Sequence, residues 1–494
     1  MRTRPVRVFS VFTLLTLALL ASVPAYGEMT TVLVTAKTDG SAPPYGGDYP
    51  AVSSDGRCVA FMSGSDELPP GAGNGYAQFY RRDVLTGTTV RVSVSSSGAM
   101  ANYNPYNWYQ PEISADGSRV EFSTMATNVV PDAANWTDVF MRDVNAGTTS
   151  WVSVNSSGVQ GNRNSDFPAI SANGRYVAFS STSFNLAPGT EDNIENVFLR
   201  DTTGGTTVRA SIAESGAQPK ADCSYPSVNN NGDVVAFVSR ANNLVANDAN
   251  TCDDVFVRYL STNHTICVSV DTIGTPANST SSMPVLTPNG RYVAFVSAAS
   301  NILPGATAGF FQVYVRDLQN GTVTRASVAT DGTIGARGGT SPSICDDGRY
   351  VAFTSQSANL VAGDTDGAND YFVRDMVAQT TTRVSVAYDG AQSNGDVWRA
   401  AMSGEGQCFA FASEATNLIP GGSSGRQIFL RKAASNPPYV PSDVASAAKA
   451  IAGLTVLSAS DSARLNVVDP ATSGVDLRDA VRIMRKAAGL DANP

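Results

Sequence analysis

The sequence predicts an all-β fold, a seven-bladed β-propeller built from four-stranded antiparallel blades. Three observations predict it: one unit occurs seven times, each unit contains strand-like segments, and the last unit lacks a strand that the N-terminal region supplies. The motif P-x-x-S-x-[DN]-G-R-x-V-A-F begins the units at Pro50, Pro111, Pro168, Pro226, Pro284, Pro342 and, without the proline, Ala400. A spacing of 57 to 61 residues with strand signals throughout is typical of a propeller.

The sixth unit illustrates the four expected strands, A to D. Residues 342–346 form strand A, and Asp347-Gly348 then makes the tight turn of a hairpin, because both residue types tolerate a positive φ. Residues 350–353 form strand B, which is β-branched and aromatic. A polar loop leads to strand C at 371–375, and a second turn leads to strand D at 381–386. Such apolar strands indicate blades that are covered on both faces.

The seventh unit ends at residues 429–431 and has no strand D, whereas an additional strand-like segment, residues 30–35, precedes the first unit. We expect the N-terminal segment to complete the seventh blade. This pairing closes the ring and removes two free sheet edges, which otherwise promote aggregation.

The repeated sequence S-x-D-G-R-x-V-A-F, D-x-F-V-R-D and G-x-T-x-R-V-S-V resembles the TolB-type β-propeller repeat of bacterial secreted and periplasmic proteins, over residues 30–432. The resemblance implies a binding platform with a WD40-like arrangement of blades. TolB itself has six blades and a separate α/β domain. This sequence has seven units and lacks that domain, so the resemblance does not imply TolB's role in its envelope complex.

The net charge of −9 and the pI near 4.8 argue against nucleic acid as a partner. Residues 1–27 have the features of a secretory signal: a charged start, the apolar run 8–21 and a small-residue cleavage site at 25–27. The apolar run is too short for a confident membrane span, and no later run approaches that length. We therefore expect a secreted or periplasmic bacterial protein without a transmembrane segment.

The expected domains are the signal peptide (1–27), the propeller (28–435), a proline-rich linker (436–441) and a small helical domain (442–494). Residues 466–483 resemble the second half of a dockerin type I module, in which a calcium loop leads into a helix. The resemblance implies Asp469, Asp476 and Asp479 as calcium ligands and a cohesin-like partner. The loop is one residue short and has Pro470 and Ala471 at ligand positions. A helical hairpin packed on the propeller is the alternative.

Export permits disulfides, and the chain has six cysteines. Cys223 precedes strand A of unit four, and Cys252 lies in the B–C loop of the same unit. Both loops emerge at one end of an up-and-down blade, so we predict a Cys223–Cys252 disulfide. Cys58 and Cys408 occupy equivalent strand B positions in adjacent units, and we expect buried thiols there because packed sheets lie about 10 Å apart.

No catalytic residues are assigned from the sequence. The only histidine, His264, begins a strand D, and lone histidines in strands are usually structural. No nucleophile elbow, zinc-protease helix or phosphate-binding loop is present. Every unit has an arginine in strand C: Arg82, Arg142, Arg200, Arg258, Arg316, Arg374 and Arg431. We expect these arginines to tie neighbouring blades together, the alternative being an anion-binding channel.

The B–C loop of unit six contains Asp364, Asp366 and Asp370 around Gly367, a group of oxygen ligands that fits Ca²⁺. Such residues also build turns by bonding to their own backbone, so a purely structural loop is the alternative. The equivalent loops of units three, five and seven lack this pattern, and the repeat itself therefore does not require calcium.

Aromatic residues gather in D–A and B–C loops, which we expect on one face of the ring. The predicted binding face contains Tyr76, Tyr103, Tyr106, Trp108, Tyr109, Trp136 and Trp398, with Tyr45 and Tyr49 nearby. Exposed aromatics on loops of a rigid scaffold are typical of recognition surfaces, although they can also fold inward and cap the blades.

These observations favour an exported, non-catalytic scaffold that binds protein or polysaccharide on the loop face, with the C-terminal region serving for docking or anchoring. One alternative is a polysaccharide lyase or glycosidase that uses Asp364, Asp366 or Asp222. Another is a structural envelope or matrix protein without a specific ligand.

Overall fold

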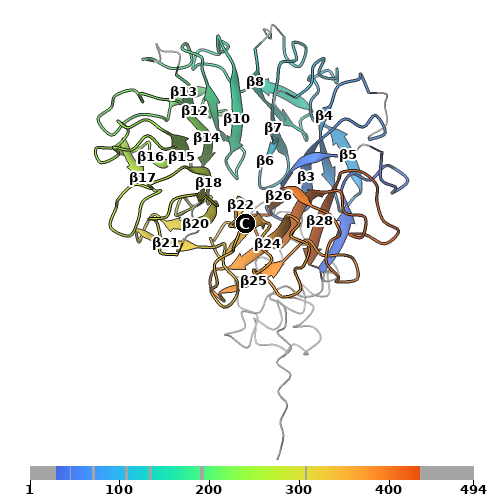
Figure 1. The fold of residues 1–494 in the computed structure, drawn as a ribbon. Helices are drawn as coiled ribbons and strands as arrows, with labels where there is room; N and C mark the ends of the chain where they lie inside the picture. Colours follow the sequence, from blue (N-terminus) through green and yellow to red (C-terminus); the bar gives the residue numbers. More distant parts are fainter. Residues whose placement is uncertain are drawn as a thin grey trace, which may run out of the picture.

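A computed structural model describes residues 29–433, apart from residues 45, 69–72, 106–109, 132, 134–135, 190–193 and 306–308. These residues form seven four-stranded antiparallel sheets, each a separate blade. The blades are arranged radially, with β6, β10, β14, β18, β22 and β26 nearest the axis and β5, β13, β17, β21 and β25 at the periphery (Figure 1). The predicted all-β, seven-bladed propeller is confirmed.

The strands run outward from the axis in each blade. Blades one to three comprise β2 (Asp48–Val52), β3 (Cys58–Ser63), β4 (Gln78–Asp83) and β5 (Thr88–Arg91); β6 (Glu112–Ile113), β7 (Arg119–Thr124), β8 (Asp138–Asp143) and β9 (Thr148–Trp151); and β10 (Ser165–Ile170), β11 (Tyr176–Ser181), β12 (Asn196–Asp201) and β13 (Thr206–Arg209). Blades four and five comprise β14 (Cys223–Val228), β15 (Val234–Ser239), β16 (Asp254–Tyr259) and β17 (His264–Cys267); and β18 (Ser281–Leu286), β19 (Tyr292–Ser297), β20 (Gln312–Asp317) and β21 (Thr322–Arg325). Blades six and seven comprise β22 (Thr340–Ile344), β23 (Tyr350–Ser355), β24 (Asp370–Asp375) and β25 (Thr380–Arg383); and β26 (Val397–Met402), β27 (Cys408–Ser413), β28 (Gln427–Ala433) and β1 (Met29–Leu33).

The N-terminal strand β1 closes the ring, as predicted. It pairs antiparallel with β28, from Met29 opposite Ala433 to Leu33 opposite Phe429. Residues far apart in the sequence thus share one sheet, and blade seven has the same number of strands as the others.

One side-chain contact recurs in every blade and explains the serine of the R-V-S-V segment. In blade four, Ser269 Oγ donates to Asp254 Oδ1 (2.6 Å) and accepts from the backbone N–H of Val255 (2.9 Å). Ser93, Ser153, Ser211, Ser327 and Ser385 bond equivalently in their blades. In blade seven the N-terminal Thr35 takes this position, donating to Gln427 Oε1 at 2.6 Å. The closing segment therefore reproduces the repeat in side-chain detail.

The glycine of each A–B turn is required by packing as well as by its backbone. Gly232 has φ +68°, and a Cβ there would lie 2.4 Å from the Tyr176 ring of the preceding blade. Gly56 would likewise collide with Cys408, and Gly348 with Tyr292. The turn of one blade thus fits against the start of strand B in the blade before it, where only glycine leaves enough room.

The strand C arginines connect neighbouring blades, as expected. Arg374 is buried, and its Nη1 donates to the backbone oxygen of Ala329, which follows blade five (3.1 Å), and to Thr381 Oγ1 (3.1 Å). Arg142 makes the corresponding bonds to Ser95 and Thr149. These guanidinium groups stabilise the contacts between blades because their several donors reach both blades at once.

The predicted Cys223–Cys252 disulfide is not formed, since all six cysteines are free. Cys223 is fully buried in an apolar cluster between blades three and four, whereas Cys252 is half-buried in its loop. The side chain at the start of strand A therefore packs toward the neighbouring blade rather than toward the loop. Cys58 and Cys408 are buried free thiols, as predicted.

The expected signal peptide, linker and dockerin-like domain lie outside the described residues, as do Asp469, Asp476 and Asp479. Within the part of the chain that the structure describes, no helix is long and apolar enough to cross a membrane.

Candidate functional site

The D–A and B–C loops of neighbouring units meet at one end of the blades. Between blades one and two, Asn104 Oδ1 accepts from the backbone N–H of Ala77 (2.8 Å), and Asn74 Nδ2 donates to the backbone oxygen of Ala101 (2.7 Å). Asparagines thus join the two loops in this part of the predicted binding face, and the loops present their side chains side by side.

Two aromatic residues of that face are brought together. The rings of Tyr76 and Tyr103 stack, with centroids 6.1 Å apart and planes 19° apart, although the side chains remain 38% and 46% exposed. Trp136 is exposed on the corresponding loop of blade two, and Trp398 is exposed at the start of β26, where Arg426 lies 4.4 Å from its ring centroid. Tyr106, Trp108 and Tyr109 lie outside the described residues.

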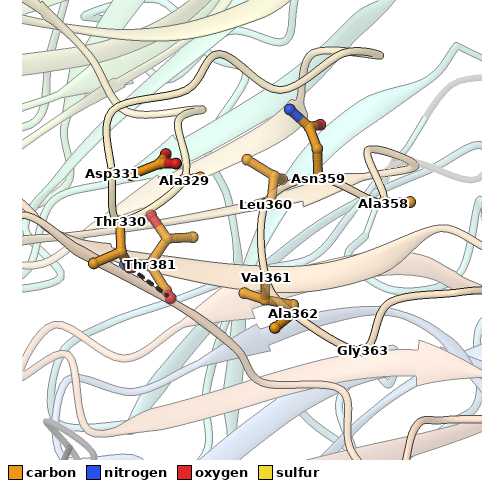
Figure 2. A pocket seen from close by; sticks show the side chains of 10 residues that line it. All are labelled: Ala329, Thr330, Asp331, Ala358, Asn359, Leu360, Val361, Ala362, Gly363 and Thr381. Carbon is orange, nitrogen blue, oxygen red and sulfur yellow. Dashed lines mark hydrogen bonds between the residues drawn. The ribbon is translucent and has the colours of Figure 1, made fainter.

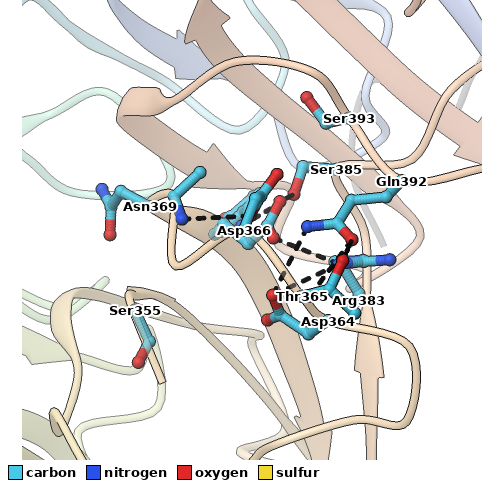
Figure 3. Close-up of polar contacts among 12 residues, drawn as sticks. Ser355, Asp364, Thr365, Asp366, Asn369, Arg383, Ser385, Gln392 and Ser393 are labelled. Carbon is cyan, nitrogen blue, oxygen red and sulfur yellow. Dashed lines mark hydrogen bonds and ion pairs between the residues drawn. The ribbon is translucent and has the colours of Figure 1, made fainter. Parts of the chain in front are cut away.

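The three acidic residues of the blade six loop converge (Figure 3). Oxygen atoms of Asp364, Asp366 and Asp370 all lie within 4.8 Å of one another. Arg383 approaches two of the three carboxylates, at 3.3 Å from Asp370 and 3.8 Å from Asp364. Gln392 Nε2 donates to Asp364 at 3.4 Å.

The environment of this acidic cluster has two consequences. Burial raises the pKa of Asp370 to about 6, although Ser385 donates to this carboxylate and Arg383 lies beside it. Burial also raises the pKa of Asp364. Three carboxylates form a donor set that suits the hard Ca²⁺ ion, which would favour their charged forms. The Arg383 guanidinium already supplies positive charge to two of them, and Asp370 also makes the serine contact common to the blades.

A shallow pocket of about 660 Å³ lies between the loops of blades five and six (Figure 2). It is lined by Leu360, Val361, Thr330 and Asp331, among others, and the Thr381 backbone N–H donates to Thr330 Oγ1 across it at 3.0 Å. Asp331 is the single ionisable residue in its lining, so the pocket does not have the grouped acids that a catalytic site needs.

A carboxyl group at the start of β14, Asp222, was a candidate acid in the sequence, and the structure places two further acids near it. Asp222 Oδ1 accepts from the backbone N–H of Glu195 at 2.9 Å. Burial, and then the charges of Asp166 and Asp222, raise the pKa of Glu195 to about 8, while burial raises the pKa of Asp166 to about 7. At neutral pH this group of acids therefore retains bound protons, as carboxyl groups in close proximity do.

A second pair of acids, in blade two, was not identified from the sequence. Glu112 and Glu121 lie opposite each other in β6 and β7. Glu121 is completely buried, neither carboxylate oxygen has a hydrogen-bond partner, and burial raises its pKa well above the usual value. The other six blades have alanine at this position, so the sequence signal was a single glutamate that interrupts V-A-F.

A further feature missed from the sequence is a set of strained residues on the innermost strands. The residue before the motif proline has positive φ in five blades: Tyr49 (58°), Phe167 (48°), Tyr225 (51°), Met283 (52°) and Ser341 (50°). Each occupies a β-bulge where the inner strand shifts register against its neighbour. A non-glycine residue in this conformation costs of order 1–3 kcal/mol. The X-Pro dipeptide was the available signal, but proline normally favours extended backbone before it.

Comparison with solved structures gives three matches of low similarity. The putative TolB from Agrobacterium tumefaciens is 15% identical with a TM-score of 0.38, over 60% of this chain and 89% of that one. TolB from Acinetobacter baumannii is 12% identical with a TM-score of 0.37, over 73% of this chain and 76% of that one. Kuenenia stuttgartiensis hydrazine synthase is 14% identical with a TM-score of 0.39, over 80% of this chain and 96% of that one.

No protein-family model matches the sequence, and no curated protein matches it. The propeller assignment therefore depends on the strand order and pairing of this chain itself.

Proposed function

We propose that the protein is an exported, non-catalytic scaffold that binds a macromolecule, protein or polysaccharide, on the face formed by its D–A and B–C loops. The observation that carries the proposal is the stacked, solvent-exposed pair of Tyr76 and Tyr103 on loops joined by hydrogen bonds. Aromatic side chains offer a large contact area and lose little conformational entropy on binding. A rigid ring holds this pair in place, which reduces the ordering cost of association.

The test uses the full chain and two variants, Tyr76→Ala with Tyr103→Ala, and Trp136→Ala. Binding is screened on a glycan array and by pull-down from a secretome, and each hit is then quantified by calorimetry. We expect the double tyrosine variant to lose at least about tenfold in affinity, because hot-spot aromatics contribute 2 kcal/mol or more. Tyr388→Ala, an exposed tyrosine outside the predicted face, is the matched control. Unchanged affinity in the double variant would contradict the proposal.

A second candidate function is calcium binding in the blade six loop, favoured by the convergence of Asp364, Asp366 and Asp370. These three residues would hold the ion, and the ion would order the loop. Calorimetric titration with Ca²⁺ should give a binding isotherm that Asp366→Asn abolishes. A flat titration of the unmodified protein would remove this proposal without affecting the first.

The C-terminal region remains proposed as a dockerin-like docking or anchoring module with Asp469, Asp476 and Asp479 as doubtful calcium ligands. A cohesin-binding assay on the full chain tests this role. The enzymatic alternative uses Asp166, Glu195 and Asp222, because a proton-sharing group of acids can provide general acid catalysis. Turnover of a polysaccharide that is lost in Glu195→Gln would replace the non-catalytic proposal.

A further inference from the structure

The strained residues of the inner strands are brought together around the ring axis. The rings of Phe167 and Tyr225, from adjacent blades, have centroids 4.3 Å apart. Arg399, at the equivalent position of blade seven, has its guanidinium carbon 5.2 Å from the centroid of Tyr49 in blade one. The inner strands that hold these residues surround the axis (Figure 1). We call Tyr49, Phe167, Tyr225, Met283 and Arg399 the axial set.

The axial set faces solvent although it lies on the innermost strands. Tyr225 and Met283 are 42% and 41% exposed, and Arg399 is exposed. Burial and the carboxylates of Glu195 and Asp166 raise the pKa of Tyr225, and the charge of Arg399 opposes this rise. Arg399 thus acts on Tyr225 although it belongs to blade seven and Tyr225 to blade four, which places both near the common axis.

Bulges re-aim side chains, and strained backbone persists where the surrounding structure enforces it. Burial of a core does not explain these conformations, because two of the strained side chains are largely exposed. The strain is instead compatible with a role in presenting aromatic faces toward the axis.

Charge indicates what the axial set would bind. Arg399 donates to the backbone oxygen of Trp398 (3.2 Å) and takes part in no ion pair among the described residues. A guanidinium without a carboxylate partner suits a ligand carboxylate, to which it can donate two parallel hydrogen bonds. The neighbouring aromatic rings offer flat apolar faces, which suit the C–H face of a sugar ring.

We propose that the axial set is a second binding site, separate from the loop face, for a saccharide that carries a carboxylate. Arg399 pairs with the carboxylate, and Tyr225, Phe167 and Tyr49 stack against the sugar rings. A cationic ligand is disfavoured by Arg399, and a neutral saccharide would leave the guanidinium without a partner.

The probe is a β-1,4-linked glucuronate trisaccharide, and cellotriose is its neutral counterpart with CH₂OH in place of the carboxylate. Calorimetry on the full chain should give affinity for the glucuronate trisaccharide at least about tenfold above that for cellotriose. Arg399→Gln should remove this preference, and Tyr225→Ala should weaken binding of both saccharides. Tyr76→Ala with Tyr103→Ala should leave it unchanged, which separates this site from the loop face.

Three results would overturn the proposal: no binding of the glucuronate trisaccharide, equal affinity for both saccharides, or full affinity in Arg399→Gln. Arg399 is exposed and makes one hydrogen bond, so the glutamine variant is expected to fold. A variant with Arg163→Gln, which changes another arginine in a D–A loop, controls for the general loss of one positive charge.

Discussion

The second and third strands of the blades and the innermost strands follow different rules. The same serine-to-strand contact occurs in all seven blades, with Thr35 substituting in the last. On the innermost strands, by contrast, equivalent positions hold tyrosine, phenylalanine, methionine, serine and arginine. Regularity therefore accompanies interactions that hold the ring together, whereas variation and backbone strain accompany side chains that face solvent. The following predictions test this division, from the largest expected effect to the smallest.

Removing residues 29–35 should have the largest effect, because it deletes β1 and the Thr35 contact together. The ring would open between blades seven and one, and Val34 and its apolar neighbours would lose their burial. We expect a loss on the order of the whole stability of a typical domain, about 5–15 kcal/mol. Urea unfolding followed by tryptophan fluorescence measures it. A midpoint equal to that of the intact chain would refute closure by β1.

Gly232→Ala should be the next most destabilising change, since its Cβ would meet the Tyr176 ring and its φ is +68°. Gly274→Ala is the matched control, with φ +92° and open space around the added Cβ. We expect a loss of about 1–2 kcal/mol from backbone strain in both variants and a further 1–3 kcal/mol from overpacking in Gly232→Ala. Equal losses in chemical denaturation would show that the turns do not pack between blades.

Glu121→Gln should stabilise the protein in a pH-dependent manner. The unfolded chain ionises near the ordinary pKa of 4.5, while burial keeps the folded carboxyl protonated to higher pH. Its contribution to stability is therefore complete below pH 4.5 and is lost as the pH rises toward the folded pKa; for its partner Glu112 the folded pKa is about 8.

We expect Glu121→Gln to lie close to the wild type at pH 5 and to gain at least about 1 kcal/mol at pH 8, the equivalent of one pKa unit. The difference between variant and wild type at each pH cancels the contributions of other acids. The exposed Glu405→Gln should show no such trend. A pH-independent difference for Glu121→Gln would contradict the buried, unpaired carboxyl.

Met283→Gly should have the smallest effect, a gain or loss within about 1 kcal/mol. Glycine relieves the positive φ of 52°, while the side chain that it replaces is 41% exposed and contributes little burial. The core methionine Met402→Gly, at normal φ, should instead lose about 3 kcal/mol or more. Thermal unfolding of the two variants compares them. Equal losses would mean that Met283 is a structural residue of the inner strand.

Much of the fold followed from the sequence because each signal was local and repeated. Asp347-Gly348 and its equivalents marked the turns, and the missing seventh strand D pointed to the N-terminal segment. Strand limits were less accurate: β22 begins at Thr340, two residues before the predicted strand, because the bulge at Ser341 extends the pairing. The pattern showed the proline but not the backbone conformation that precedes it.

The candidate sites were predictable only in part. Grouping of Asp364, Asp366 and Asp370 followed from their proximity in one loop. The Tyr76–Tyr103 pair required two loops to meet, which the blade geometry implied. The proximity of Asp166, Glu195 and Asp222 and the gathering of Phe167, Tyr225 and Arg399 depend on contacts between blades, for which the sequence has no local signal.

Two arginines give the most direct test of the division between scaffold and recognition. Arg374 lies buried on strand C of blade six, and Arg399 is exposed on the inner strand of blade seven. Unfolding free energy and affinity for the glucuronate trisaccharide are measured for Arg374→Gln and Arg399→Gln in parallel. We predict that Arg374→Gln loses about 2–3 kcal/mol of stability and keeps its affinity, while Arg399→Gln keeps its stability and loses affinity at least about tenfold. The reverse assignment, or both losses in the same variant, would contradict it.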